Sequence, residues 1–407
     1  EMTSSLVGSE MCIRDRPRRP ENEKERFMKI KDNVLIVTSI AEDVSGIEAI
    51  KSEFEKNHKD YNVVVIDERQ YGAEKAATRR RKNRERFIQS IPTFYRRVKT
   101  MGHVFTVKSK NKIDRRRALS NKLSGSARKI YNAVLRFAPD VIVVTTPRLM
   151  HETIIAKKRT RFKYPVIGIS EKFTFDKAFY NMSADGYIVE NVDMKNQLTA
   201  MGYSSGRVHV MGFPIEENVP DVDYVFKLKE HLGLNLNPTV YLSGGAIGSK
   251  ELMPVFELLL DQGDIINLIV NCGKNENLYS AMLRETERRN SQNVKLYLNV
   301  DEGAEDTLIA SDCLITIYDG SLIYRAFLLG IPVVAFAPDT GAEKSDLKYL
   351  MEKQLVYFAD DYNHVIIGMY DVIQTGLGKK LSESAIMRTR ATSLKDICTL
   401  LASYGRK

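Results

Sequence analysis

The stretch that most constrains the fold of this chain is LITIYDGSLIYRAFLLGIPVVAFAP, at residues 314–338. Its pattern predicts a buried strand, a tight turn, a helix and a second buried strand, at Leu314–Ile317, 318–320, Ser321–Leu329 and Val333–Ala337. Two strands joined through one helix form a parallel pair. The turn where the helix begins lies at the ligand-binding edge of such a sheet, and the free N–H groups of the first helical turn favour an anion there. The stretch therefore predicts a parallel α/β sheet with a phosphate-type site at its turn.

The same alternation of strands and helices recurs through both halves of the chain. In the first half the expected strands are Val34–Ser39, Tyr61–Asp67, Asp140–Thr145, Pro165–Ile169, Gly186–Glu190 and Val208–Met211. In the second half they are Thr239–Leu242, Ile265–Asn271 and Val294–Leu298, followed by the two strands of the opening stretch. Regular alternation of this kind predicts an α/β fold with helices covering parallel sheets.

A polar, irregular segment divides the two series and sets the expected domain boundaries. We expect two Rossmann-like domains at 28–215 and 239–382, joined by a link at 216–238, and a C-terminal helix at 383–407 that packs back across the junction. The first 27 residues contain no apolar segment typical of a secretory signal. We expect them to be a non-native or disordered tail, with the native start at Met28.

Composition and cysteine spacing favour a cytosolic protein. Of the 407 residues, 43% are hydrophobic and 28% are charged, which is ordinary for a globular protein. No apolar run reaches the roughly 18 residues of a transmembrane helix. The four cysteines are scattered without a C-x-x-C pair, which argues against a disulfide scaffold or a structural zinc site. We expect no metal and no cofactor.

A strongly basic insert at residues 69–136 stands out from an otherwise acidic protein. It holds 21 of the 61 Lys and Arg residues and 3 of the 52 acids, so the rest of the chain has 40 basic against 49 acidic residues. Such a segment implies an anionic partner. Apolar residues at helical spacing interleave with the charges, and the residues expected to touch an anionic membrane are Arg84, Phe87, Ile91, Phe94, Arg96 and Arg97. The alternative is a solvated cationic helical pair packed on the domain. No nucleic-acid partner is expected, because no recognised binding module accompanies the charge.

Four segments together resemble a known enzyme family. They read VIGISEKFTFDKAFYNMSADGYIVEN at 166–191, RVHVMGFPI at 207–215, TVYLSGGAIG with NLIVNCGKNENL at 239–278, and the opening stretch. In order and spacing they resemble the GT-B glycosyltransferases that include the monogalactosyldiacylglycerol synthases and processive diacylglycerol glycosyltransferases. The resemblance implies two Rossmann-like domains facing across a cleft, a nucleotide-sugar donor carried by uridine diphosphate, and a lipid or lipid-linked acceptor.

The resemblance also implies inversion at the sugar carbon, which requires a general base for the acceptor hydroxyl. Glu171 keeps an acid at the end of a strand that faces the cleft, and Asp43 falls near the place where the family has a histidine. Both are candidate bases. Asp43 has an alternative role as the cap of the helix that begins near Ser45.

The donor side of the family pattern is partly changed in this chain. The residues expected to contact the donor are Gly244, Gly245, Gly248, Lys274, Asp319, Gly320, Ser321, Arg325 and Glu343. The glycines follow a strand and precede a helix, so backbone N–H groups can approach a phosphate closely. Asp319 stands where the family has glycine, and Arg325 stands where it has the glutamate that binds the ribose hydroxyls. An arginine cannot accept hydrogen bonds from those hydroxyls, although it can pair with a phosphate.

The expected function is a glycosyltransferase that moves a hexose to a lipid or lipid-linked acceptor, at the inner face of the cell membrane and peripherally bound to it. The changed donor residues leave a second interpretation open, a GT-B pseudoenzyme or binding protein with a degenerate donor site. A third is a wall or capsule polysaccharide glycosyltransferase or a nucleotide-sugar epimerase. The basic insert with its apolar stripe favours the first over the third.

Overall fold

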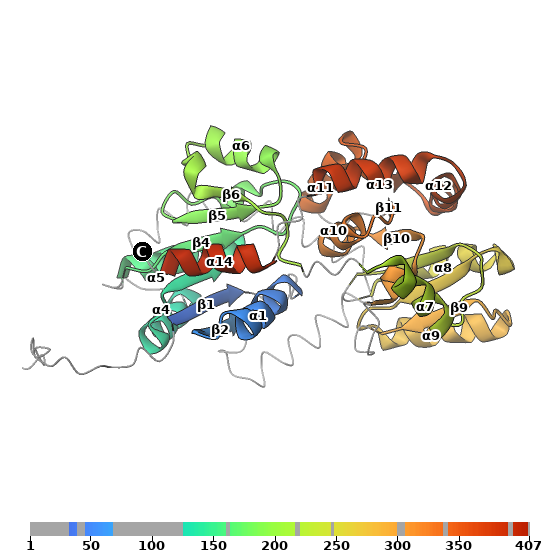
Figure 1. The fold of residues 1–407 in the computed structure, drawn as a ribbon, viewed down its shortest axis with the longest axis horizontal. Helices are drawn as coiled ribbons and strands as arrows, with labels where there is room; N and C mark the ends of the chain where they lie inside the picture. The colour runs from blue at the N-terminus through green and yellow to red at the C-terminus, as the bar shows by residue number, and fades with distance from the viewer. Residues whose placement is uncertain are drawn as a thin grey trace, which may run out of the picture.

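In this computed structural model of the chain, the described residues are 32–38, 45–67, 125–159, 163–215, 220–245, 248–298, 306–336, 341–389 and 394–405. They form two six-stranded sheets in which every recorded strand pair is parallel (Figure 1). The predicted α/β fold with two Rossmann-like halves is thereby confirmed.

The N-terminal sheet has the strand order β2-β1-β3-β4-β5-β6. Its strands are β1 (Asp32–Thr38), β2 (Tyr61–Asp67), β3 (Val141–Val144), β4 (Val166–Ile169), β5 (Gly186–Val189) and β6 (Val208–Val210). Helices cover both faces, so the central strands are apolar along their whole length: all four residues of β3 are fully buried. The covering helices are α1 (Ser45–Asn57), α4 (Gly125–Phe137), α5 (Pro147–Arg159), α6 (Val192–Ala200) and α14 (Leu394–Gly405).

The C-terminal sheet has the order β12-β11-β10-β7-β8-β9. Its strands are β7 (Thr239–Ser243), β8 (Asn267–Asn271), β9 (Val294–Tyr297), β10 (Cys313–Ile317), β11 (Val333–Phe336) and β12 (Tyr357–Ala359). Its helices are α8 (Leu252–Leu260), α9 (Glu276–Arg288), α10 (Gly320–Leu328), α11 (Gly341–Glu352), α12 (Tyr362–Gln374) and α13 (Leu377–Arg388). The opening stretch of the sequence is β10, α10 and β11, at the centre of this sheet.

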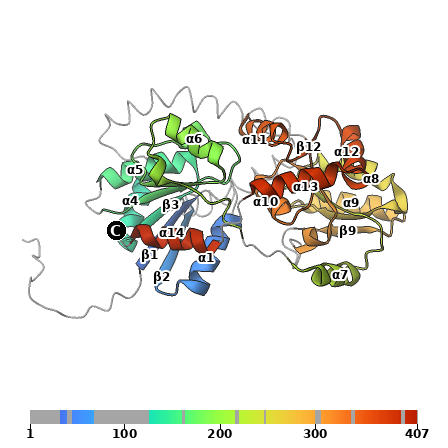
Figure 2. The same cartoon turned by 45° about the horizontal axis from the view of Figure 1, so that its top comes forward.

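Most predicted element ends fall within two residues of the observed ones, but the C-terminal segment differs. A helix was expected from about residue 383, whereas α13 already begins at Leu377 and a second helix, α14, follows at Leu394. The chain packs α13 on the C-terminal domain and then returns α14 to the N-terminal domain (Figures 1 and 2). There Cys398 and Leu401 join the same core as Ile50 of α1, and Tyr404 contacts His209 with 2.9 Å between its hydroxyl and Nε2.

The basic insert ends in an ordinary core helix. Its last residues form α4, which packs on β1 and α5 through Ile130 and Val134. Periodic apolar residues therefore place this part against the sheet, and only residues 69–124 of the insert lie outside the described chain.

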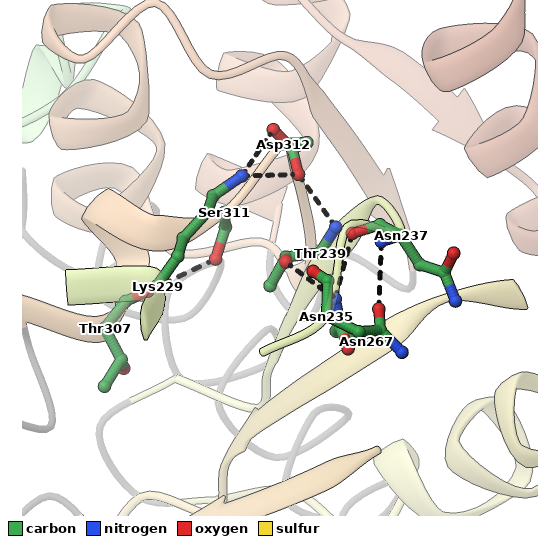
Figure 3. A network of polar contacts seen from close by, with 8 residues as sticks. All are labelled: Lys229, Asn235, Asn237, Thr239, Asn267, Thr307, Ser311 and Asp312. Carbon is green, nitrogen blue, oxygen red and sulfur yellow. Dashed lines mark hydrogen bonds and ion pairs between the residues drawn. The ribbon is translucent and has the colours of Figure 1, made fainter. Parts of the chain in front are cut away.

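The link between the domains is anchored on the C-terminal sheet. It contains α7 (Val222–His231), and the Lys229 ammonium lies 3.0 Å from both carboxylate oxygens of Asp312. Asp312 also accepts a hydrogen bond from the Thr239 N–H, while the Asn267 amide donates to two carbonyl oxygens of the loop that precedes β7. The residues drawn in Figure 3 are Lys229, Asn235, Asn237, Thr239, Asn267, Thr307, Ser311 and Asp312. This network lies where β7, β8 and β10 begin, at the edge opposite their carboxyl ends.

Candidate active site

The carboxyl ends of strands from both sheets meet where the two domains touch. The loop after β4 comes from the N-terminal sheet, and the turn at residues 318–320 follows β10 of the C-terminal sheet. A Cβ atom placed on Gly320 would lie 3.7 Å from the Glu171 carbonyl oxygen and 3.8 Å from the Phe213 ring. The predicted donor turn therefore lies against the N-terminal domain, at the edge where open α/β sheets bind ligands.

An aromatic cluster joins the domains beside this turn. Phe213 of the N-terminal domain stacks on Tyr324 of α10, with 4.4 Å between ring centroids and 4° between ring planes. Phe173 contacts Phe213 at 5.3 Å and Phe327 at 5.9 Å. At most 2% of each of these four residues is exposed, so α10 is held from its apolar side by the neighbouring domain.

Glu171 lies between the starts of two helices from different domains. Its backbone packs against the donor turn before α10, and its carboxylate packs against the first turn of α1. A Cβ atom at Gly46 would lie only 2.5 Å from the Glu171 Oε1 atom and 2.8 Å from the Pro214 ring. Gly46 thus leaves the space that the carboxylate occupies at the start of α1.

The second predicted base, Asp43, lies outside the described residues. It precedes Gly46 by three positions in the chain. Its role as a base or as a helix cap stays a prediction.

Another acid at the same edge was not singled out from the sequence. Glu190 follows β5 directly, is 5% exposed and accepts a hydrogen bond from the Asn191 side chain. Burial raises the pKa of Glu190 to about 7, and the nearby acids Asp346 and Asp193 add to the rise. A carboxyl group with a pKa near neutrality is a feature of functional sites, though buried structural acids share it.

The glycine loop after β7 has the geometry expected of a close backbone approach. Gly245 and Gly248 have φ angles of 72° and 78°, in the left-handed region that favours glycine. A side chain at Gly248 would overlap the Cys272 carbonyl oxygen, and the Asn275 amide donates to the Gly248 carbonyl at 3.0 Å. The loop is thus fixed to the start of α9. Gly244 precedes it, and the predicted donor residue Lys274 lies exposed on the adjacent loop.

The donor turn differs from its prediction in one respect. The helix α10 begins at Gly320, one residue earlier than expected, and Asp319 is its N-cap, accepting a 3.1 Å hydrogen bond from the Leu322 N–H. The other Asp319 oxygen lies 3.4 Å from where a Cβ atom of Gly245 would be, so this turn and the glycine loop are neighbours. Asp319 therefore already supplies the negative charge that the start of α10 favours.

Three further predicted donor residues lie on the helices α10 and α11. Ser321 is buried with 7% of its surface exposed, and Arg325 follows about one helical turn later, half-buried. Glu343 is half-buried in the first turn of α11. Lys274 lies on the loop after β8, so the nine predicted donor residues come from four successive segments of the C-terminal domain.

A buried carboxylate that the sequence reading missed joins both sides of the junction. Asp346 of α11 is 1% exposed and accepts hydrogen bonds from the Thr174 backbone N–H at 2.7 Å, the Thr174 hydroxyl, and the Tyr318 hydroxyl at 2.8 Å. Burial raises the pKa of Asp346, and the Lys172 charge and these hydrogen bonds oppose that rise. Thr174 belongs to the N-terminal domain, and Tyr318 directly precedes the Asp319 cap.

Two further polar residues extend this contact, Tyr349 on α11 and Lys353 directly after the helix. The Tyr349 hydroxyl lies 3.2 Å from a carboxylate oxygen of Asp193, and the Lys353 ammonium lies 2.9 Å from the same atom. Hydrogen bonding from Lys353 lowers the pKa of Asp193. The sequence signal was present, because Asp346, Tyr349 and Lys353 are spaced by three and four residues, as on one helix face. Their partners on the other domain could not be read from that spacing.

The six residues expected to touch a membrane, Arg84, Phe87, Ile91, Phe94, Arg96 and Arg97, lie outside the described residues. In the part of the chain that the structure describes, no helix is long and apolar enough to cross a membrane.

A groove of about 790 Å³ lies apart from the predicted site. It is formed by the link, the start of α13 and the edge of the sheet shown in Figure 3, and its lining includes Phe226, Leu236, Asp312 and Lys379. None of the predicted donor residues lines this groove, so size alone does not locate the site.

Sequence comparison relates the N-terminal domain to glycolipid synthases. Residues 43–215 match the family described as monogalactosyldiacylglycerol (MGDG) synthase. The chain resembles the diacylglycerol glycosyltransferases. It is 24% identical to the processive diacylglycerol β-glucosyltransferase of Bacillus subtilis over 64% of this chain and 65% of that protein. It is 23% identical to the chloroplastic monogalactosyldiacylglycerol synthase 3 of Arabidopsis thaliana, over 67% of this chain and 60% of that protein.

Solved structures support the fold over nearly the whole chain. MurG of Acinetobacter baumannii superposes with a TM-score of 0.59 at 10% identity, covering 91% of this chain and 99% of that one. MnaA of S. aureus, solved with UDP, gives a TM-score of 0.58 at 13% identity, covering 92% of this chain and 96% of that one. The protein has the GT-B fold, as its sequence resemblance implied.

Proposed function

We propose that this protein transfers a hexose from a nucleotide sugar to a hydroxyl group of a diacylglycerol-type lipid, with inversion at the sugar carbon. The observation that carries the proposal is the position of Glu171, whose carboxylate lies against α1 while its backbone lies against the donor turn at Gly320. Transfer requires a base on the acceptor side within reach of a sugar held on the donor side. The relatives named as diacylglycerol glycosyltransferases support the acceptor class.

In the proposed reaction, the Glu171 carboxylate accepts the proton of the acceptor hydroxyl. The hydroxyl oxygen forms a bond to the anomeric carbon of the sugar, and the bond from that carbon to the phosphate oxygen breaks. The electron pair of the broken bond leaves with the nucleoside diphosphate. Attack from the face opposite the leaving group gives inversion, and no oxidant or reductant is needed.

The donor is proposed to bind on the C-terminal domain between the glycine loop and the start of α10. The loop backbone at Gly244, Gly245 and Gly248 would lie close to the diphosphate, with the Gly244 N–H as its donor. The N–H groups of Gly245 and Gly248 donate within the loop, to the Ser243 hydroxyl and the Gly245 carbonyl. Asp319 repels that diphosphate, because like charges near a protein surface interact by about 1 kcal/mol or more. Arg325 provides a compensating positive charge on the same helix, and a phosphate is the donor group that it can bind.

The N-terminal domain is proposed to meet its lipid acceptor at the anionic inner face of the cell membrane. The relatives act on lipid molecules by name. The basic insert at 69–136 provides cationic and apolar residues together, and this combination binds anionic bilayers peripherally.

The proposal is tested by two measurements on the same preparation. UDP, GDP, CMP and their sugars are screened by thermal shift, where a ligand at 100 times its Kd stabilises the fold by about 2.7 kcal/mol. Transfer is then measured by mass spectrometry with UDP-glucose and UDP-galactose and diacylglycerol in vesicles. We expect a shift with uridine nucleotides and a glycosylated lipid product. Binding without product from any donor contradicts the proposal and leaves a binding protein; no binding at all makes the protein a pseudoenzyme.

Membrane association has its own test. Vesicle flotation compares neutral with anionic lipid at low and high salt, using a variant in which Arg84, Arg96 and Arg97 become Gln. We expect binding that needs anionic lipid, weakens with salt because the charges are screened, and falls in the variant. Binding that is indifferent to lipid charge and salt would contradict electrostatic attachment.

A further inference from the structure

We propose that Asp346 is a positioning residue that couples the Glu171 loop to the donor turn. One buried carboxylate receives hydrogen bonds from Thr174, three residues after Glu171, and from Tyr318, one residue before the Asp319 cap. The coupling itself consists of these hydrogen bonds, which do not depend on any activity. Its effect on transfer rests on the function proposed above.

The geometry makes this contact specific. The two Asp346 oxygens have different donors. Oδ1 accepts hydrogen bonds from the Thr174 backbone N–H and hydroxyl, and Oδ2 accepts one from the Tyr318 hydroxyl. Because the donors come from different domains, the carboxylate can keep all three hydrogen bonds only in one relative placement of the loop and the turn. Hydrogen bonds to a charged acceptor are stronger than neutral ones, and an unmade one is costly when the acceptor is buried.

The surrounding contacts hold α11 against the N-terminal domain. Tyr349 of α11 and Lys353, directly after the helix, both contact Asp193 of α6. The aromatic stack of Phe213 on Tyr324 fixes α10 from the other side of the turn. Between these two contacts, Asp346 bonds to both the Glu171 loop and the donor turn.

The contact is tested without activity by hydrogen–deuterium exchange of the full chain. In Asp346→Ala, the segments 171–176 and 318–322 lose a shared acceptor, and we expect their amide exchange to rise at least about tenfold. Asp346→Asn keeps an oxygen for the Thr174 N–H and an amide that can donate to the Tyr318 oxygen, so it should restore most of the protection. The matched control is Asp312→Ala, which should raise exchange around the link network of Figure 3 and leave both segments unchanged. Unchanged exchange at 171–176 in Asp346→Ala overturns the proposal.

The effect on transfer is tested with Tyr318→Phe, which removes one hydroxyl and leaves the ring in place. A positioning role predicts that kcat falls about tenfold while the KM for the nucleotide sugar and the melting temperature change little. A purely structural role predicts a lower melting temperature and an unchanged kcat for the folded fraction, which overturns the positioning role. If the unaltered protein transfers no sugar, the proposed function fails, while the exchange experiment still decides whether Asp346 couples the two segments.

Discussion

One carboxylate lies at the start of α1 and another at the start of α10, but the two reach their helix ends in different ways. At α1 the carboxylate is Glu171, which arrives from another element and occupies the space left by Gly46. At α10 it is Asp319, which belongs to the helix itself and caps the Leu322 N–H. The difference agrees with the proposed role of Glu171 as the base and with a structural role for Asp319 as a cap.

The strongest test of this comparison is Glu171→Gln. Removing a general base is expected to lower kcat by about 10²–10⁴-fold, because no side chain then takes the proton from the hydroxyl of the lipid acceptor. The nucleotide-induced thermal shift should remain, because the donor residues are untouched. Glu287→Gln is the matched control, an exposed glutamate on α9. Turnover that survives in Glu171→Gln would move the role of base to Asp43, with Asp43→Asn as the next variant.

Glu190 sharpens the comparison, because it is a buried acid at the same edge that precedes the Asn191 N-cap of α6 and does not itself cap the helix. Its folded-state pKa of about 7 lies above its ordinary value of 4.5, so the folded protein binds this proton more tightly than the unfolded chain does. The free energy of unfolding should therefore fall as pH rises from about 4.5 to about 7, by up to about 3 kcal/mol. Denaturant melts across this range measure the slope. Glu190→Gln should flatten it, and an equally steep slope in that variant would assign the proton to another group.

The space beside α1 is tested with Gly46→Ala. The added methyl group would contact Glu171 and Pro214 at 2.5 Å and 2.8 Å, so either the carboxylate or the helix must move. We expect a loss of about 1–3 kcal/mol in the free energy of unfolding and a reduced kcat. Gly206→Ala provides the control, because a Cβ atom there meets nothing within 4 Å. Equal stability and activity in both variants would contradict the packing of Glu171 on α1.

The smallest expected effect concerns the cap of α10. Asp319→Asn keeps a side-chain oxygen for the Leu322 N–H but removes the negative charge, so stability should change by less than about 0.5 kcal/mol. Affinity for UDP should rise about fivefold, because a repulsion of about 1 kcal/mol is removed. Asp221→Asn, at the N-cap of α7, controls for the loss of a capping charge away from the site. A weaker affinity would mean that Asp319 binds the donor directly. An unchanged affinity would contradict the repulsion between Asp319 and the diphosphate.

Much of the fold was readable from local patterns. The strand Tyr61–Asp67 was predicted with its observed ends, and the strand-turn-helix of the opening stretch lies within one residue of β10 and α10. Strands buried on both faces are continuous apolar runs, and these runs are visible without knowing what covers them. The C-terminal segment was predicted less well, since the switch from α13 to α14 depends on which domain each helix packs against.

The sequence by itself determined the α/β class, the two domains, the glycine loop and the position of an acid after β4. These follow from periodicity and from residue types that tolerate special backbone angles, which are local properties. The tertiary structure alone decided that Glu171 faces Gly46 and that Asp346 joins Thr174 to Tyr318. Thr174 and Asp346 are 172 positions apart, and residue spacing within one element contains no information about a partner in another domain.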